Sequence, residues 1–206
     1  MKAWQFTNTH EPLVLTEVEE PTPGPGQVLL EMKAAGLCHS DVGLLEDEGW
    51  LSMLAKTPIT IGHENAGVVA ELGEGVTEFS VGDRVGVCPT TEVGAPGHHD
   101  DGGFAPQLLV RADTLVPMPD GLDFVHGAAG TDAGMTSHSA VITQGGVKAG
   151  DNVGIIGLGV WARSAPASPC WPAPTSTSPR STRRSGRWRR RSAPRTSRPP
   201  SRTSRA

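Results

Sequence analysis

Alternating apolar and polar positions mark the first part of the chain. Between Gln27 and Ala35 apolar residues recur at every second position, which is the pattern of a strand with one buried face. Other short apolar runs follow, separated by turns rich in glycine and proline. Strands are expected at 3–6, 13–18, 27–35, 104–110 and 114–117, and a strand system is expected over 59–72. In 81–87, Gly82-Asp83 is a turn between apolar residues. Such short strands with regular turn signals indicate a mainly β domain, built as a barrel or a sandwich.

The pattern changes after residue 120. Residues 124–142 are rich in alanine and poor in β-branched residues, which predicts two helical pieces with a break near Gly134. Residues 152–156 form an apolar run that leads into Gly157-Leu158-Gly159. A strand that enters such a glycine turn begins a dinucleotide-binding unit. A shorter helix over 42–45, capped by Ser40 or Asp41, is expected nearer the start of the chain.

Composition divides the chain near residue 160. Residues 161–206 contain no Asp, Glu, Lys, Ile, Leu or Phe and consist mostly of Arg, Ser, Pro, Thr and Ala. They bury too little apolar area to offset the entropy of ordering, so we expect a disordered tail. The domains predicted are therefore a β domain over 1–118, connecting helices with the first strand of an incomplete α/β domain over 119–160, and this tail.

Charge changes at the same point. Residues 1–160 hold all 22 Asp and Glu but only six of the 18 Lys and Arg, a net charge of −16, while 12 arginines lie in the tail. Because phosphate binding requires clustered Lys and Arg, the acidic part argues against nucleic acid as its partner. For the tail alone, nucleic acid or an anionic surface stays open as a partner, although the tail lacks lysine and glycine–aromatic repeats.

Cysteine use and hydropathy indicate a cytoplasmic protein without a membrane partner. Three cysteines are too few for a disulfide framework and fit a reducing compartment. The first residues have no apolar run of signal-peptide length, and no stretch of the chain is apolar enough to span a membrane.

Metal-competent side chains are the candidate chemistry. Catalytic zinc uses three protein ligands and leaves a fourth position open. The candidate ligands are Cys38, His63, Glu64 and Asp132, with Ser40 and Asp41 beside the first. Taken singly, Cys38 is more typical of a buried thiol and His63 of a structural histidine.

The combination of motifs resembles a family. Gly36-Leu37-Cys38-His39-Ser40-Asp41 followed by Gly62-His63-Glu64 is similar to the zinc-dependent alcohol dehydrogenases of the medium-chain dehydrogenase/reductase superfamily. In family order there follow Val81-Gly82-Asp83-Arg84-Val85, Asp101-Gly102-Gly103-Phe104-Ala105, Thr131-Asp132-Ala133-Gly134-Met135-Thr136 and Gly157-Leu158-Gly159. The resemblance covers residues 1–160 and implies a GroES-like barrel as catalytic domain, a Rossmann coenzyme domain, and zinc in the cleft between them.

The resemblance also implies residue roles. Cys38, His63 and Asp132 would be the zinc ligands, and Glu64 would lie beside the metal and coordinate it in some states. Asp132 stands where many members have cysteine, which gives a harder ligand set.

Other roles concern groups around the metal. Asp41 would orient the imidazole of His63, and Ser40 would pass the alcohol proton toward solvent. Gly157 and Gly159 would bind the cofactor, NAD or NADP.

The implied reaction is oxidation of a primary or secondary alcohol to an aldehyde or ketone. Zinc acts as Lewis acid on the alcohol oxygen while hydride passes to the nicotinamide. The implied partners are a small alcohol or carbonyl compound and, for the parent protein, further copies of itself. Trp50, Leu51 and Leu54 are candidates to line an apolar substrate pocket. Zinc-free quinone reductases of the same fold are disfavoured by the ligand set, whereas a non-catalytic GroES-like zinc-binding module is the alternative.

The chain departs from the family after residue 87. Many members hold a second, structural zinc there with four closely spaced cysteines, but only Cys88 is present in this run, so we expect one catalytic zinc and no structural zinc. The cluster His98-His99-Asp100-Asp101 has no metal-binding partner at suitable spacing, and we expect a solvated loop.

The second departure is the coenzyme fingerprint, which requires a helix, a second strand and an acidic residue after the glycines. In a back-translation, one nucleotide restored after codon 159 yields Gly-Gly-Leu-Gly-Gln-Ile-Gly. We therefore interpret residues 160–206 as the product of a shifted reading frame, and we expect a truncated chain without activity of its own.

The gene tests this interpretation directly. We expect a single-base change near codon 160 to restore a coenzyme-domain frame when codons 155–165 are sequenced. A gene in which no such change restores that frame contradicts the interpretation.

Overall fold

The computed structural model describes residues 1–89, 94–156 and 159. All of them belong to one compact unit, residues 1–173. The second unit, residues 174–206, and the whole tail predicted over 161–206 lie outside the described residues. No helix in the described part of the chain is long and apolar enough to cross a membrane.

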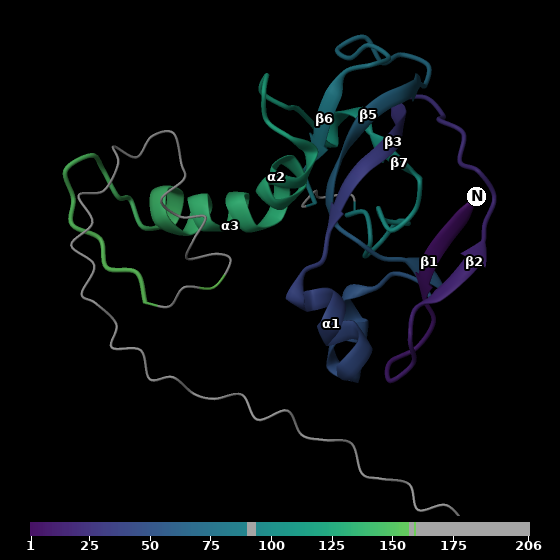
Figure 1. Ribbon diagram of the computed structural model, residues 1–206, viewed down its shortest axis with the longest axis horizontal. Coiled ribbons are helices and arrows are strands. Elements are labelled where there is room, and N and C mark those ends of the chain that lie inside the picture. The colour runs from purple at the N-terminus through teal and green to yellow at the C-terminus, as the bar shows by residue number, and fades with distance from the viewer. Residues whose placement is uncertain (90–93, 157–158, 160–206) are drawn as a thin grey trace, which may run out of the picture. The chain divides into compact units, whose positions relative to one another are not determined.

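In the described part of the chain, eight antiparallel strands form two sheets. This confirms the mainly β class (Figure 1). The first sheet has the order β2-β1-β4, and the second has the order β7-β3-β5-β6-β8. The strands are β1 Lys2–Phe6, β2 Val14–Glu17, β3 Gln27–Gly36, β4 Ile59–Thr60, β5 Glu64–Leu72, β6 Arg84–Val87, β7 Gln107–Arg111 and β8 Leu115–Pro117. The second sheet buries the larger core, which contains Val28, Leu30, Val69, Val85, Val87, Leu108, Val110, Ala112 and Leu115.

The strand system expected over 59–72 consists of two strands, and they belong to different sheets. β4 pairs with β1, whereas β5 lies between β3 and β6. The chain turns between them at Gly62, which has a φ of +100°, a conformation that side chains rarely adopt. His63 therefore lies at the corner between the two sheets.

Helix α1 (His39–Glu46) follows β3 directly. Its N-cap is Cys38, two residues before Ser40 and three before Asp41, the caps expected from sequence, and Asp41 is the third helical residue. The Asp41 carboxylate accepts the Cys38 backbone N–H at 2.8 Å, so the acidic residue stabilises the helix start from inside the first turn. Two 3₁₀ helices, Glu48–Met53 and Ala112–Thr114, lie elsewhere in the loops.

The break expected near Gly134 does not occur. α2 (Phe124–Ala129) packs against β3 and β5, and the helical path continues without interruption to residue 144. Gly134 keeps right-handed helical angles, because one glycine weakens a helix without ending it. The continuation consists of a π-helical segment Gly130–Gly134, α3 (Met135–His138) and a second π-helical segment Ser139–Gln144.

The strand expected over 152–156 is not formed. A strand of a parallel sheet needs neighbouring strands for its hydrogen bonds and helices over its faces. No described strand pairs with residues 151–156, and Ile155 and Ile156 are 45% and 103% exposed. The prediction of a strand in this segment is therefore wrong.

Candidate metal centre

His63 is fixed by close packing of two backbone segments. A Cβ atom on Gly62 would lie 2.5 Å from the Phe104 ring, and one on Gly102 would lie 2.4 Å from the Gly62 carbonyl oxygen. The Gly103 N–H donates to the same carbonyl at 2.8 Å. Residues 95–104 thus pack against the backbone at Gly62. This contact fixes the backbone position of the next residue, His63.

Asp41 connects two of the predicted ligands. It is 1% exposed, and one carboxylate oxygen accepts the Cys38 N–H. The other oxygen lies 3.8 Å from His63 Nδ1, too far for a hydrogen bond. Nδ1 is buried and has no hydrogen-bond partner among the described residues. Asp41 therefore lies beside His63, as expected from the sequence, and acts on the imidazole by charge.

Asp132 arrives from the π-helical segment, far along the chain. Its Oδ2 lies 3.5 Å from Cys38 Sγ and 3.5 Å from His63 Nε2. One donor atom from each of Cys38, His63, Glu64 and Asp132 lies within 4.8 Å of all the others. The structure thus brings together all four side chains that the sequence nominated for metal binding.

Glu64 occupies space that a glycine leaves open. Gly36 pairs with Glu64 across β3 and β5, and a Cβ atom there would lie 1.9 Å from Glu64 Oε2 and 2.8 Å from its Cβ. The carboxylate is buried against the other ligands as a result. The glycine at the end of β3 is therefore a requirement of the site.

The buried candidate ligands carry negative charge that must be compensated. Burial raises the pKa of Glu64 to about 7, and the charge of Asp132 acts in the same direction. The hydrogen bond from His63 instead holds the pKa of Asp132 at about 2. Burial alone would lower the pKa of His63, but Asp132, Asp41 and Glu64 together raise it. Without a metal, protons must therefore supply the positive charge.

These residues fit a zinc ion. Thiolate, imidazole and carboxylate are the groups that bind zinc in proteins, and three such ligands with a carboxylate beside them match a catalytic site. A divalent cation would also compensate the buried negative charge. Because burial raises the pKa of the Cys38 thiol, the sulfur keeps its proton until a cation replaces that proton.

Ser40 contacts Cys38 instead of standing apart from it. Its hydroxyl and its backbone N–H both hydrogen-bond the Cys38 thiol, and they partly oppose the effect of burial on the pKa of that thiol. Its expected part in proton transfer stays a prediction.

His98 is the residue that sequence reasoning missed. Its ring stacks on that of His63, with 4.8 Å between the centroids and 27° between the planes. Burial, assisted by the charge of His63, lowers the pKa of His98 to about 4, and its Nε2 has no hydrogen-bond partner among the described residues.

The prediction of a solvated loop is therefore wrong at His98, whereas His99 and Asp100 are exposed to solvent. The cause is Gly97, which has a φ of +83° and lies against the Gly62 backbone, so that the next residue meets the imidazole. A glycine next to a histidine is the only sequence signal for this contact.

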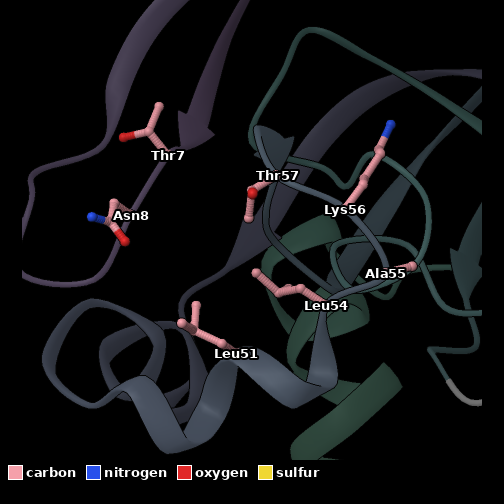
Figure 2. A pocket seen from close by; sticks show the side chains of 7 residues that line it. All are labelled: Thr7, Asn8, Leu51, Leu54, Ala55, Lys56 and Thr57. Carbon is pink, nitrogen blue, oxygen red and sulfur yellow. The ribbon is translucent and has the colours of Figure 1, made fainter.

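The expected apolar substrate pocket is only partly present. A cavity of about 280 Å³ is lined by Leu51 and Leu54 together with polar residues (Figure 2). The full lining is Thr7, Asn8, Leu51, Leu54, Ala55, Lys56 and Thr57. Trp50 is not part of it and instead packs against Gly43 in the smaller core. No candidate ligand lines this cavity, so we do not assign the substrate to it.

The predicted cofactor residues lack structural support. Gly157 lies outside the described residues, and Gly159 is exposed, with no atom within 4 Å of where a Cβ would stand. Their role in cofactor binding stays a prediction.

Comparison with known proteins identifies the family. Residues 24–120 match the alcohol dehydrogenase GroES-like domain. An alcohol dehydrogenase of Geobacillus stearothermophilus is 36% identical over 177 residues, which cover 77% of this chain and 52% of that protein. The chain belongs to the medium-chain zinc-type alcohol dehydrogenases.

Other relatives agree with this assignment. A sorbitol dehydrogenase of Halalkalibacterium halodurans is 37% identical over 161 residues, covering 69% of this chain and 45% of that protein. The crystal structure of the alcohol dehydrogenase from Aeropyrum pernix has a TM-score of 0.71 at 29% identity, covering 84% of this chain and 57% of that one. A cobalt- and zinc-bound alcohol dehydrogenase from Pyrobaculum aerophilum also has a TM-score of 0.71, at 28% identity, covering 80% and 54%. The chain spans about half the length of these relatives.

The Gly36–Glu64 contact gives a direct test of the site. We expect Gly36→Ala to lower the free energy of unfolding by about 1–3 kcal/mol, because the new methyl group overlaps Glu64. Urea denaturation of the metal-free chain measures this. Gly154→Ala is the matched control, since no atom lies within 4 Å of the added carbon. Equal stability of the two variants would contradict the contact.

Proposed function

We propose that this chain is the zinc-binding catalytic part of an alcohol dehydrogenase that oxidises a primary or secondary alcohol with a nicotinamide cofactor. The convergence of Cys38, His63, Glu64 and Asp132 within 4.8 Å carries this proposal. Family membership supports the reaction class, because relatives of this chain bear the names alcohol dehydrogenase and sorbitol dehydrogenase.

Cys38, His63 and Asp132 would hold the zinc, and Glu64 would lie next to it. When bound, zinc supplies a Lewis acid that polarises the oxygen of an alcohol or carbonyl compound. Burial raises the pKa of Glu64 to about 7 in the metal-free chain, and the ionised carboxylate would serve as an alternative ligand to the zinc.

Three neighbouring side chains prepare the ligands. Asp41 accepts the Cys38 backbone N–H with one carboxylate oxygen and acts on the His63 imidazole by charge with the other. Ser40, which touches the Cys38 thiol, would move the alcohol proton away. His98 covers one face of the His63 ring and keeps water from it.

The finer assignments belong to the same proposal. We assign one catalytic zinc and no structural zinc, because Cys88 is the single cysteine of its run. NAD or NADP, a small alcohol or carbonyl substrate, and assembly with further copies belong to the full-length parent. The division at residue 118 and the cytoplasmic location stay predictions.

A non-catalytic zinc-binding module is the second candidate. The observation that favours it is the irregular, exposed course of residues 151–156, where a coenzyme domain would have its first strand. Under this reading the chain binds zinc but does not position a nicotinamide.

Zinc content tests the centre itself. We expect one zinc per chain by elemental analysis, and loss of that zinc in Cys38→Ala and in His63→Gln, because each removes one of three ligands. Cys88→Ala and His126→Gln, which alter the same residue types outside the centre, should keep the metal. Zinc retained by both ligand variants would overturn the proposal.

Cofactor reduction tests whether the chain is active by itself. We expect the zinc-loaded chain, mixed with alcohol and NAD, to form no more NADH than His63→Gln does, because the described residues provide no coenzyme sheet. NADH absorbance measures this. Formation of NADH that depends on both zinc and alcohol would show that the chain is active as it stands and would exclude the non-catalytic module.

A further inference from the structure

Three hydroxyl groups lie between Gly130 and His138 on the helix that carries Asp132, and one of them bonds differently from the other two. Thr131 donates to the Ala128 carbonyl at 2.7 Å, and Ser137 donates to the Ala133 carbonyl at 2.6 Å. Such bonds to the preceding turn are the usual choice of a hydroxyl inside a helix. Thr136 instead donates to a side chain, Oδ1 of Asp132, at 3.0 Å.

Because of this bond, the two carboxylate oxygens of Asp132 have different partners. Oδ1 accepts the Thr136 hydroxyl, while Oδ2 lies 3.5 Å from both Cys38 Sγ and His63 Nε2. A free aspartate rotates easily about its last torsion and can present either oxygen or both. The hydroxyl removes that freedom before any ligand binds.

Residue 136 supplies this donor through its hydroxyl alone. A neutral valine side chain at residue 136 would have a similar shape but would leave Oδ1 without this donor.

We infer that Thr136 is a positioning residue for the metal centre: it holds Oδ1 of Asp132 so that Oδ2 alone is presented to the metal. The inference rests on the proposed metal-binding function and deepens it. A cysteine ligand has a single sulfur atom and needs no such support, so the role of Thr136 follows from the aspartate in this chain.

The test is a double-mutant cycle on zinc affinity, measured by competition with a chromophoric chelator. Thr136→Val should weaken zinc binding about tenfold to a hundredfold, the usual effect of removing a group that orients a ligand. Thr136→Ser, which keeps the hydroxyl, should bind zinc nearly as the unaltered chain does. In an Asp132→Cys chain, Thr136→Val should have no effect, because the sulfur has no second oxygen to hold.

Two further measurements separate this role from a structural one. Thr131→Val is the matched control, since it removes a hydroxyl from the same helix that bonds a backbone carbonyl, and it should leave zinc affinity unchanged. With Co²⁺ in place of zinc, Thr136→Val should shift the visible ligand-field bands, while the cysteine-to-cobalt charge-transfer band stays. A purely structural role would move neither set of bands.

The outcomes distinguish the two proposals. If the unaltered chain binds no zinc, the proposed function fails and the inference fails with it. If the chain binds zinc but Thr136→Val leaves the affinity unchanged, the inference alone is overturned. The same holds if Thr136→Val weakens the affinity equally in the unaltered chain and in the Asp132→Cys chain.

Discussion

Backbone contact at Gly62 is the constraint on which the site depends. The corner between the two sheets is possible only because the 95–104 segment approaches the Gly62 backbone where side chains would not fit. One consequence is the position of His63 at the start of β5, and another is the stacking of His98 on its ring. A larger residue at Gly62 or Gly102 would therefore move a metal ligand as well as a loop.

The residues packed around this corner are mainly charged or polar instead of apolar. Asp41, Glu64 and Asp132 meet His63 and Cys38 in a largely buried space, and buried charges are costly unless they are compensated. In the metal-free chain the compensation comes from protons, as the raised pKa values of Glu64 and His63 show. The cluster is thus poorly suited to be only a structural element and well suited to a cation.

In the proposed metal centre, an aspartate at residue 132 in place of a cysteine changes more than ligand hardness. A carboxylate has two donor atoms and a rotatable end, so its geometry must be set by its surroundings. The helix supplies that setting one turn later, at Thr136, through a hydroxyl that does not bond the backbone as its neighbours do. The aspartate at residue 132 and the hydroxyl at residue 136 therefore act together within one helical turn.

Sequence by itself determined β3, because its alternation is a local property that fixes one buried face. It also nominated the side chains that the structure brings together, since thiol, imidazole and carboxylate keep their chemistry in any fold. It could not show that residues 59–72 divide between two sheets, that the helix passes through Gly134, or that residues 152–156 form no strand. Each of those depends on partners distant in the chain. The contact of His98 with His63 and the approach of Asp132 Oδ2 to Cys38 and His63 were decided only by tertiary structure, because both arise where segments separated in sequence are brought to within a few ångströms.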